Sequence, residues 1–379
     1  MSLVAVAIIS DLEFGGAQRQ VVELANHMDP EQCRMYVVSL SSFVPLADSL
    51  RDRDQRLKLV LRRFRFDFTV VPRLIGLLRS VQASVIHSYL FDATIAARLA
   101  GRAGGCAAII GSERNSDYVL KRSDFVALRI TQLLSDLTIA NSSAGADFNA
   151  RMLGDSKERY RVVHNGVDVE RFNVRRAEEA LRSELGIKPH QPVVGMFASF
   201  KPQKNHPYWL RAARRVVDRF PDVKLLFVGD ELNKGMSDSV EFKQKLNRTV
   251  DELRLRGNCL FIGNRKDVER YYNLCTCTVL PSLFEGTPNA ALESMASGVP
   301  VVATRVADNA YIIPDGKAGY LVGLTDEEAL AERVGRLLKD GTLRESLGRS
   351  ARQWAVDEFS GRRLAEKTLA VYREAVARS

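Results

Sequence analysis

Residues 279–304 read VLPSLFEGTPNAALESMASGVPVVAT. An apolar strand opens this stretch, and a short loop that contains Glu285 and Gly286 connects the strand to a helix. We expect Thr287 to cap this helix and Pro288 to be its first residue, because these residue types are favoured at those positions. The apolar sequence GVPVVAT then forms a second strand. The order strand, helix, strand predicts a βαβ unit of a parallel sheet.

The loop between this strand and helix is suited to bind an anion. A helix N-terminus offers free N–H groups and the positive end of the helix dipole, and Gly286 lets a ligand approach the backbone closely. Glu293 lies one to two turns into the helix, so its carboxylate and that of Glu285 could span roughly 10 Å. This separation suits the hydroxyls of a long ligand better than one shared proton. Taken alone, either glutamate could also be a solvated acid near a helix end.

Alternating strands and helices extend from this stretch over the whole chain. In the first half, apolar strands are expected at 3–10, 35–40, 57–61, 84–89, 107–112, 136–142 and 160–166, with helices at 17–28, 70–81, 93–103 and 143–153. In the second half, strands are expected at 192–200, 224–230, 259–263, 277–282 and 298–305, with helices at 207–220, 239–255, 267–275, 289–297, 326–340 and 361–378. A charged helical segment at 170–186 separates the two halves.

This pattern predicts an α/β protein with two Rossmann-like domains that face each other across a cleft. The 379 residues fit two domains of roughly 100–200 residues each. We expect the first domain at 1–175 and the second at 190–360, with a C-terminal helix at about 361–379 that packs back on the first domain. Such sheets bind ligands beyond the carboxyl ends of their strands, which is where Glu285 falls.

Composition excludes several classes of protein. With 46% hydrophobic and 27% charged residues, the chain resembles a globular protein rather than a disordered one. The apolar N-terminus has no basic region before it, so we expect a buried strand there rather than a signal peptide. No apolar run reaches the roughly 18–20 residues of a membrane span. The five cysteines include no CxxC pair, so we expect inert thiols in a cytoplasmic protein.

Several common cofactor and metal motifs are absent from the sequence. No GxGxxG, GxxxxGK[ST], HExxH or GxSxG motif occurs, and the five histidines lack the spacing of metal ligands. Asp52 and Asp54 form a DxD pattern of the kind that binds a metal and a nucleotide in some sugar transferases, but they lie in a basic segment. We therefore expect neither a cofactor nor a metal.

The string EGTPNAALE, from Glu285 to Glu293, resembles the E-x7-E signature of the retaining GT-B glycosyltransferases of group 1, family GT4. Further similarities to this family occur in order along nearly the whole chain. They are Gly15-Gly16 after the first strand, VIHSY around His87, IANS at 139–142, VVHNGVD at 162–168, KPQKN at 201–205, FVGD around Gly229, FIGNRKDV at 261–268 and ASGVPVVAT at 296–304. Together these similarities are specific, whereas any one alone would be weak.

The resemblance implies a nucleotide-sugar donor, with UDP as the expected nucleotide, bound mainly by the second domain. On this basis Glu285 contacts hydroxyls of the donor sugar, Glu293 contacts the ribose, and Lys204 contacts the diphosphate. Lys204 alone could also be a solvated lysine at a helix start. Donor contacts are further implied for Gly15, Gly16, Ser199, Lys201, Gly229, Gly263, Arg265, Gly286, Thr287, Pro288 and Asn289.

The sequence departs from the family pattern at two candidate positions. Many relatives carry an arginine where Ser199 stands, so we expect Lys201 to supply the missing charge. Many also carry a second histidine where Tyr89 stands, which leaves His87 open between an active-site residue and a histidine of the core. The candidate catalytic residues are Glu285, Lys204 and His87.

The resemblance also implies a reaction that retains configuration without a metal. The acceptor would attack on the face of the leaving group, and the leaving phosphate oxygen would take the acceptor proton. We expect a saccharide or a lipid-linked molecule as the acceptor. Two other functions stay open, a UDP-sugar epimerase of the same fold and a module that binds sugar nucleotides without catalysis.

Much of the net charge of +9 comes from residues 51–79, where nine Lys and Arg stand against three Asp. Within this basic stretch, RRFRFDF at 62–68 interleaves arginine with phenylalanine. One interpretation is a solvated face above core phenylalanines. The other is peripheral docking on the anionic inner face of the cell membrane, where a lipid-linked acceptor would lie. Nucleic-acid binding is not expected, because the aromatic residues lack the context of an RNA-binding motif.

Overall fold

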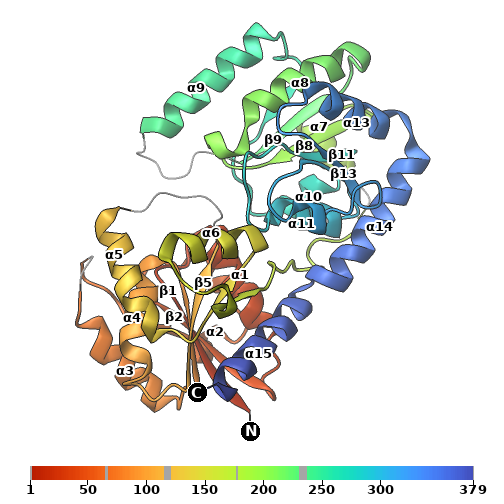
Figure 1. Cartoon of the computed structure of the whole chain (residues 1–379). Coiled ribbons are helices and arrows are strands. Elements are labelled where there is room, and N and C mark those ends of the chain that lie inside the picture. The colour runs from red at the N-terminus through yellow and green to blue at the C-terminus, as the bar shows by residue number, and fades with distance from the viewer. Residues whose placement is uncertain (1, 65–66, 115–120, 176–177, 230–236, 379) are drawn as a thin grey trace. The chain divides into compact units, whose positions relative to one another are not determined.

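The computed structural model describes residues 2–64, 67–114, 121–175, 178–229 and 237–378. Arg65 of the basic stretch and Asp230, the last residue of a predicted strand, therefore lie outside the described residues. The chain divides into two units. Unit 1 comprises Met1–Gly166 and Phe359–Ser379, and unit 2 comprises Val167–Glu358. Each unit is built on one parallel sheet with helices around it (Figure 1).

Unit 1 contains a seven-stranded parallel sheet with the strand order β3-β2-β1-β4-β5-β6-β7. Its strands are β1 (Leu3–Ile9), β2 (Cys33–Ser39), β3 (Leu57–Leu59), β4 (Val85–Tyr89), β5 (Ala108–Glu113), β6 (Leu137–Ala140) and β7 (Tyr160–Val162). The order reverses between β1 and β4, where Ala7 pairs with His87. In doubly wound sheets, the loops beyond such a switch point bind ligands.

Helices cover both faces of this sheet. The helices of unit 1 are α1 (Gly16–His27), α2 (Arg53–Arg56), α3 (Val70–Ser80), α4 (Phe91–Gly101), α5 (Arg122–Thr131), α6 (Ser143–Leu153) and α15 (Gly361–Ala377), with the 3₁₀ helices η1 (Pro45–Ser49), η2 (Gln132–Leu134) and η3 (Lys157–Arg159). Successive strand residues point to opposite faces, so Ala7 and Ile9 of β1 join one hydrophobic core and Ile8 joins another. Helices α1 and α15 cover the first core, and α3 and α4 cover the second (Figure 1).

Helix α15 brings the C-terminal end of the chain back to unit 1. The Arg161 guanidinium donates to both carboxylate oxygens of Glu374, at 2.9 Å from Nε and 2.5 Å from Nη2. Tyr372 is fully buried, and its hydroxyl lies 2.8 Å from Nδ1 of His87. The last helix thereby completes the core of the first unit.

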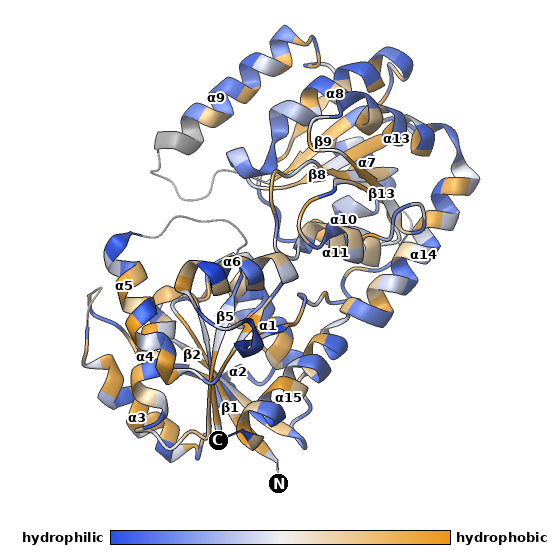
Figure 2. Cartoon of the chain, viewed as in Figure 1, coloured by the Kyte–Doolittle hydropathy of each residue, from blue (hydrophilic) through white to orange (hydrophobic). Residues whose placement is uncertain are grey.

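Unit 2 contains a six-stranded parallel sheet with the order β10-β9-β8-β11-β12-β13. Its strands are β8 (Val193–Phe197), β9 (Lys224–Val228), β10 (Cys259–Phe261), β11 (Cys277–Leu280), β12 (Val301–Thr304) and β13 (Gly319–Val322). Its helices are α7 (Glu179–Glu184), η4 (Pro202–Lys204), α8 (His206–Arg219), α9 (Ser237–Glu252), α10 (Val268–Tyr272), α11 (Asn289–Ala296), α12 (Asn309–Ile312), α13 (Glu327–Lys339) and α14 (Gly341–Phe359), whose last residue belongs to unit 1. Figure 2 shows the strands of both sheets as mainly hydrophobic, as expected for sheets covered on both faces.

Several elements differ from the prediction. The strand β13 and the helices α2, α5, α12 and α14, together with the 3₁₀ helices, fall outside the predicted elements. The helix predicted at 170–186 is wrong over its first part, since only α7 is helical among the described residues of that segment. The Asp168 carboxylate accepts the N–H groups of Glu170 and Arg171, each at 3.0 Å, and holds these residues in a turn instead.

Each unit buries one neutral histidine. His87 has no exposed surface, and burial together with the nearby charge of Arg114 holds its pKa well below the ordinary 6.5. His206, the first residue of α8, is 1% exposed among aromatic rings, and burial, with a further effect of Lys204, lowers its pKa to about 3. Both rings therefore stay neutral in the folded chain well below pH 6.5.

Unit 2 is expected to lose stability as the pH falls from 6.5 to 5. Below pH 6.5 the unfolded chain binds a proton at His206, whereas the folded chain does not. The free energy of unfolding therefore drops by up to about 1.4 kcal/mol per pH unit. Both tryptophans, Trp209 and Trp354, lie in unit 2, so urea unfolding followed by tryptophan fluorescence reports on this unit. His206→Phe should flatten the pH dependence, since the rings of Phe200 and Phe227 already pack around the site. If the stability of this variant still fell with pH as steeply as that of wild type, His206 would not be the group responsible.

Candidate active site

Four loops follow neighbouring strands at the carboxyl edge of the unit 2 sheet. The order β10-β9-β8-β11 places the ends of these strands next to one another. Gly263 follows β10, Gly229 follows β9, Ser199 follows β8, and the loop with Glu285 follows β11. The structure thus brings predicted donor-binding residues from four separate segments to one edge of one sheet.

Gly229 lets two of these loops approach closely. Its φ angle is +142°, and a Cβ atom at this position would lie 2.2 Å from the carbonyl oxygen of Ala198. Its N–H donates to the carbonyl of Gly263 at 3.0 Å, and the N–H of Ala198 donates to the carbonyl of Val228 at 3.0 Å. Because any side chain would collide with the backbone, this position requires glycine.

Gln203 joins the loop after β8 to the loop after β11. Its carbonyl accepts the N–H of Leu283 at 2.9 Å, and its side-chain amide donates to the carbonyl of Phe284 at 2.9 Å. The next two residues turn sharply, because Asn205 adopts the left-handed conformation at φ +52°. This connection holds Lys204 beside Glu285.

Lys204 and Glu285 form an ion pair with 2.5 Å between Nζ and Oε1. The Glu285 residue is only 5% exposed, and the Lys204 side chain is 20% exposed. Two charges so far removed from water are stable only while each has a partner. A ligand that separates this pair must therefore offer an anion to the lysine and hydrogen-bond donors to the carboxylate.

A second cation, Lys201, lies near this pair. Partial burial and the charge of Lys204 lower the pKa of the Lys201 ammonium, which indicates that the two positive charges repel each other. Ser199, whose carbonyl accepts the N–H of Lys201 at 2.9 Å, is half-buried at the start of the same loop. The sequence prediction that Lys201 replaces a charge missing at Ser199 remains untested, but the pair of lysines would favour a doubly charged ligand.

Helix α11 begins at Asn289, as in the predicted range 289–297, but its cap differs from the prediction. Pro288 has an extended backbone, with φ −75° and ψ 109°, and is the N-cap, so Asn289 is the first helical residue. The prediction of Thr287 as N-cap and Pro288 as first helical residue is therefore wrong by one position. Thr287 and Pro288 are buried, and Gly286 is half-buried. The first N–H groups of α11 still follow the Glu285 loop directly, as an anion site requires.

Glu293 is held by a buried tyrosine. Its Oε2 accepts the hydroxyl of Tyr272 at 2.8 Å, and Glu293 is only 9% exposed. The Tyr272 ring is fully buried and stacks on Phe197 with 3.7 Å between ring centroids. The edge of the same ring meets Phe172. Because packing fixes the ring, its hydroxyl fixes the direction of the carboxylate.

Sequence reasoning missed two residues of this site, Gln203 and Tyr272. Gln203 lies inside the KPQKN string that resembles the family, but its role depends on loop residues about 80 positions further along. Tyr272 lies in the predicted helix at 267–275, where its only sequence signal is the repeated tyrosine at 271 and 272. Neither contact leaves a local pattern.

The predicted site residues of unit 1 lie at two places. Gly15 caps α1 with φ −131°, and Gly16 is the first residue of that helix, so both lie at the turn after β1. His87 lies inside the unit, with Nδ1 2.8 Å from the Tyr372 hydroxyl and Nε2 2.7 Å from Oγ of Ser112. The Tyr89 hydroxyl also lies 3.2 Å from Nδ1. Full burial and these partners favour a histidine of the core, and its catalytic role stays a prediction.

Arg265, the remaining predicted donor contact, is exposed, and its guanidinium lies 6.0 Å from the centroid of the Tyr271 ring. Within the described part of the chain, no group of three or more His, Cys, Asp or Glu side chains is placed to hold a metal ion.

Two family models match the chain. Residues 14–171 match Glycosyltransferase Family 4, and residues 177–354 match Glycosyl transferases group 1. The two matches together cover most of the chain. The chain therefore belongs to the group 1, family 4 glycosyltransferases, which confirms the resemblance seen in the sequence.

Curated relatives are a quarter to a third identical to the chain over the aligned residues. A D-inositol 3-phosphate glycosyltransferase of Corynebacterium urealyticum is 29% identical over 245 residues, 63% of this chain and 57% of that protein. The UDP-Gal:alpha-D-GlcNAc-diphosphoundecaprenol alpha-1,3-galactosyltransferase of Escherichia coli is 25% identical over 307 residues, 78% of this chain and 76% of that protein. The chain thus spans less than two thirds of the length of the first of these relatives.

Solved structures share the fold over the whole chain. Anabaena Alr3699/HepE in complex with UDP gives a TM-score of 0.83 at 18% identity, over 99% of this chain and 100% of that one. A glycosyltransferase from Rickettsia africae gives a TM-score of 0.83 at 17% identity, over 100% of both chains. Together with the two parallel α/β sheets, these similarities confirm the predicted GT-B fold class.

Tyr272→Phe is expected to destabilise unit 2 by about 1.5–3 kcal/mol, because it leaves the buried Glu293 carboxylate without its hydroxyl donor. Tyr271→Phe is the matched control, a neighbouring tyrosine that is 3% exposed. Its hydroxyl has no hydrogen bond among the described residues, so this variant should stay near wild type. Urea unfolding followed by tryptophan fluorescence measures both. Equal midpoints for the two variants would show that the Tyr272 hydroxyl does not hold Glu293.

Proposed function

We propose that the chain is a retaining glycosyltransferase that moves a hexosyl group from a UDP-sugar to a saccharide or lipid-linked acceptor, without a metal. The observation that carries this proposal is the Lys204–Glu285 ion pair, which lies at the loop before α11 in a chain of the group 1, family 4 glycosyltransferases. The pair unites a cation for a diphosphate with a carboxylate for sugar hydroxyls. We place this activity in the cytoplasm, at the inner face of the membrane where the acceptor is lipid-linked.

The names of similar proteins support a UDP-sugar and both acceptor classes. The Escherichia coli relative is named for UDP-Gal and a diphosphoundecaprenol-linked sugar, and the Corynebacterium relative for D-inositol 3-phosphate. Anabaena HepE has been solved with UDP and with UDP-glucose. These names support UDP as the nucleotide and leave the acceptor to experiment.

Donor binding would exchange the partners of the ion pair. The diphosphate takes over the ammonium of Lys204, with Lys201 and the first N–H groups of α11 adding positive potential. Glu285 then accepts hydroxyl hydrogens of the donor sugar, and Glu293 accepts those of the ribose. Because each buried charge exchanges one partner for another, the exchange avoids an unpaired charge in the interior.

Transfer breaks the bond between the anomeric carbon and the phosphate oxygen and forms a bond from the acceptor oxygen on the same face. The leaving phosphate oxygen takes the acceptor proton, so no protein base is required at the reacting carbon. Positive groups fixed in advance around the diphosphate stabilise the charge that develops on it, which is the largest contribution available to such a site. Lys204 is the main such group.

Glu285→Gln and Lys204→Met are each expected to lower transfer by about 10²–10³-fold, because each removes a charge aimed at the reacting groups. Transfer is measured as UDP released from UDP-glucose or UDP-galactose, with GlcNAc-diphosphoundecaprenol and free disaccharides as acceptor probes. The matched control is Lys339→Met, an exposed lysine at the end of α13. Full activity in both site variants would contradict the assignment.

Each single variant removes one partner of the Lys204–Glu285 ion pair, so folding needs its own control. The double variant Glu285→Gln/Lys204→Met removes both charges and should unfold near wild type while remaining inactive. Thermal shifts with UDP, GDP and ADP then identify the nucleotide, since a ligand at 100 times its Kd adds about 2.7 kcal/mol of stability. We expect UDP to give the largest shift in wild type and a reduced shift in Lys204→Met.

Two outcomes would favour the alternative functions. A UDP-sugar epimerase would convert the free donor without any acceptor, and NMR of the donor pool detects that conversion. A binding module without catalysis would show the UDP thermal shift but no release of UDP with any acceptor probe.

A further inference from the structure

Helix α5 and the following turn η2 expose a row of apolar side chains. Val126, Ile130 and Leu133 are 43%, 69% and 81% exposed, and Leu134 is 39% exposed. The spacing of four and then three residues places the first three on one side of the helix. We call these four side chains the α5 stripe. Leu99 of the neighbouring helix α4 is exposed as well, at 39%.

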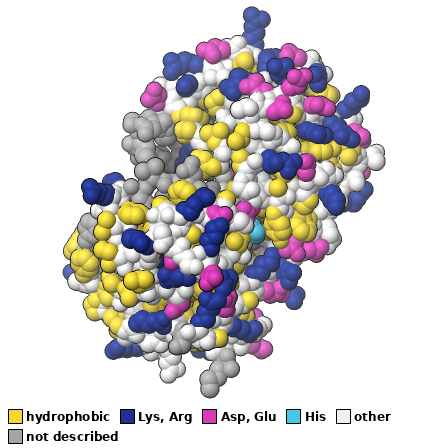
Figure 3. Space-filling model, viewed as in Figure 1, with side chains coloured by type: hydrophobic (Ala, Val, Ile, Leu, Met, Phe, Trp, Pro, Cys, Tyr) yellow, Lys and Arg dark blue, Asp and Glu magenta, His cyan; other side chains and the backbone are white. Residues whose placement is uncertain are grey.

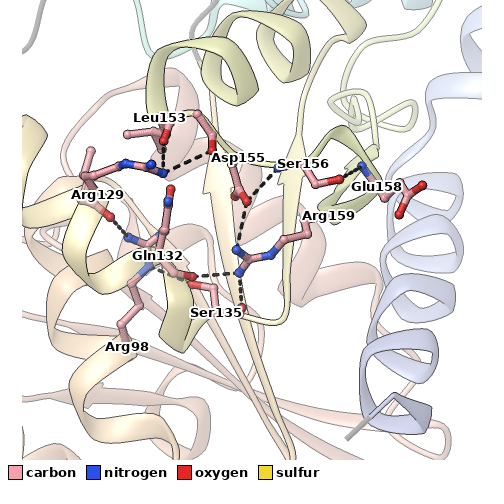
Figure 4. Close-up of polar contacts among 11 residues, drawn as sticks. Arg98, Arg129, Gln132, Ser135, Leu153, Asp155, Ser156, Glu158 and Arg159 are labelled. Carbon is pink, nitrogen blue, oxygen red and sulfur yellow. Dashed lines mark hydrogen bonds and ion pairs between the residues drawn. The ribbon is translucent and has the colours of Figure 1, made fainter.

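The opposite side of α5 and η2 is held to unit 1 by arginines (Figure 4). Arg98 of α4 is buried and donates to the carbonyl of Leu128 at 3.1 Å, to Oγ1 of Thr131 at 3.0 Å and to Oγ of Ser135 at 2.8 Å. These bonds satisfy backbone and hydroxyl groups at the C-terminal end of α5. Since Arg98 carries a charge into the interior, the contact it makes there is costly to break.

Two further arginines complete this attachment. Arg159 donates to the carbonyls of Gln132 and Ser135 and forms an ion pair with Asp155 at 3.0 Å (Figure 4). Arg129 of α5 donates to the carbonyls of Leu153 and Gly154 at the end of α6. Charged groups therefore bind the inner side of α5 along its C-terminal half.

Only part of the apolar surface of α5 faces the core, where Leu128 is buried and Phe125 and Ala127 are half-buried. An amphipathic helix usually turns its apolar side to the core, whereas Leu128 is the only buried residue of α5. Rotating the stripe inward would break the bonds of Arg98, Arg129 and Arg159 at once. Figure 3 shows hydrophobic side chains at the edge of unit 1 where Figure 1 places α4 and α5. The exposure of the stripe is thus enforced by the fold.

Positive charge accompanies the stripe. Lys121 and Arg122 are exposed at the start of α5. Arg129 is exposed beside Ile130, although its guanidinium bonds to the carbonyls at the end of α6. The other charged group that α5 contributes is the carboxylate of Asp124. On the neighbouring elements, Arg102 is already paired with Asp136, at 2.5 Å. Once this ion pair is set aside, the charged groups around the stripe carry a net positive charge.

The basic stretch at 51–79 uses much of its own charge within the fold. Arg53 pairs with Asp48 at 2.6 Å, Arg62 with Asp92 at 2.5 Å and Arg73 with Asp67 at 3.3 Å. The guanidinium groups of Arg56 and Arg79 bond to backbone carbonyls. This stretch still exposes Phe64 and Phe68, at 63% and 70%, but its arginines are largely committed to unit 1.

We propose that the α5 stripe docks unit 1 on the surface of an anionic lipid bilayer. Apolar side chains flanked by lysine and arginine suit the boundary between headgroups and acyl chains, where the apolar groups enter and the cations meet anionic lipid. A second copy of the chain fits less well. A twofold contact sets a patch against itself, which would bring Lys121 and Arg122 close to their own copies.

The proposal requires only docking from the surface. No helix in the described ranges is both long and apolar enough to cross a membrane. It is also independent of the proposed function, because docking is measured without donor or acceptor. The test can therefore fail while the glycosyltransferase assignment stands, and the reverse also holds.

Co-sedimentation of the full chain with phosphatidylcholine vesicles, with and without phosphatidylglycerol, tests the proposal. Wild type should bind the anionic vesicles, and Ile130→Ser/Leu133→Ser should bind at least about tenfold more weakly, because two apolar side chains no longer enter the bilayer. The matched control is Val174→Ser/Leu324→Ser, two side chains of unit 2 that are 67% and 41% exposed. This control should bind as wild type does.

Charge variants separate the two basic surfaces. Lys121→Glu/Arg122→Glu should lose binding to anionic vesicles, whereas Arg51→Glu/Arg63→Glu in the basic stretch should keep most of it. The proposal is overturned if wild type binds neither kind of vesicle, or if the stripe variant binds as wild type does. It is also overturned if light scattering shows a wild-type dimer that the stripe variant dissociates, since the stripe would then face a second copy.

Discussion

The candidate site depends on one connection between two loops of unit 2. Gln203 bonds to the backbone at Leu283 and Phe284, and this connection places Lys204 2.5 Å from Glu285. Without it, the two largely buried charges would lose their mutual ion pair, which is costly in the interior. The same loop leads into α11, which carries Glu293. A cation, the first amides of a helix and two carboxylates are therefore held in fixed positions relative to one another. A long anionic ligand can bind to all of them at once.

The sequence predicted the strands of both sheets except β13, and it predicted the edge that carries the site. Buried parallel strands appear as short apolar runs, and their carboxyl ends share one edge, so the order of residues along the chain already places Gly229, Gly263 and the Glu285 loop together. Gln203 and Tyr272 could not be assigned in this way. Their bonds reach residues about 80 and 20 positions away, and no local pattern records which distant carbonyl or carboxylate a side chain will meet.

Helix α5 shows a different limit of sequence reasoning. Periodicity reveals which residues share a side of a helix, but it does not reveal which side faces the core. Here the side of α5 and η2 that faces unit 1 is contacted by Arg98 of α4 and Arg159 of η3. The outward position of the apolar stripe could therefore only be seen in the structure. His87 shows the same limit, because its burial depends on Tyr372 from the far end of the chain.

Unit 1 is discontinuous in sequence, since Met1–Gly166 is completed by Phe359–Ser379 while Val167–Glu358 forms unit 2 between them. During synthesis, the strands of the first unit emerge early but lack helix α15, which shares with α1 the cover of one face of their sheet. Unit 2 contains all of its own strands in one segment and can fold while that face is partly uncovered. The first unit to be translated is thus the last to be finished, and transiently exposed apolar surface of this kind favours aggregation.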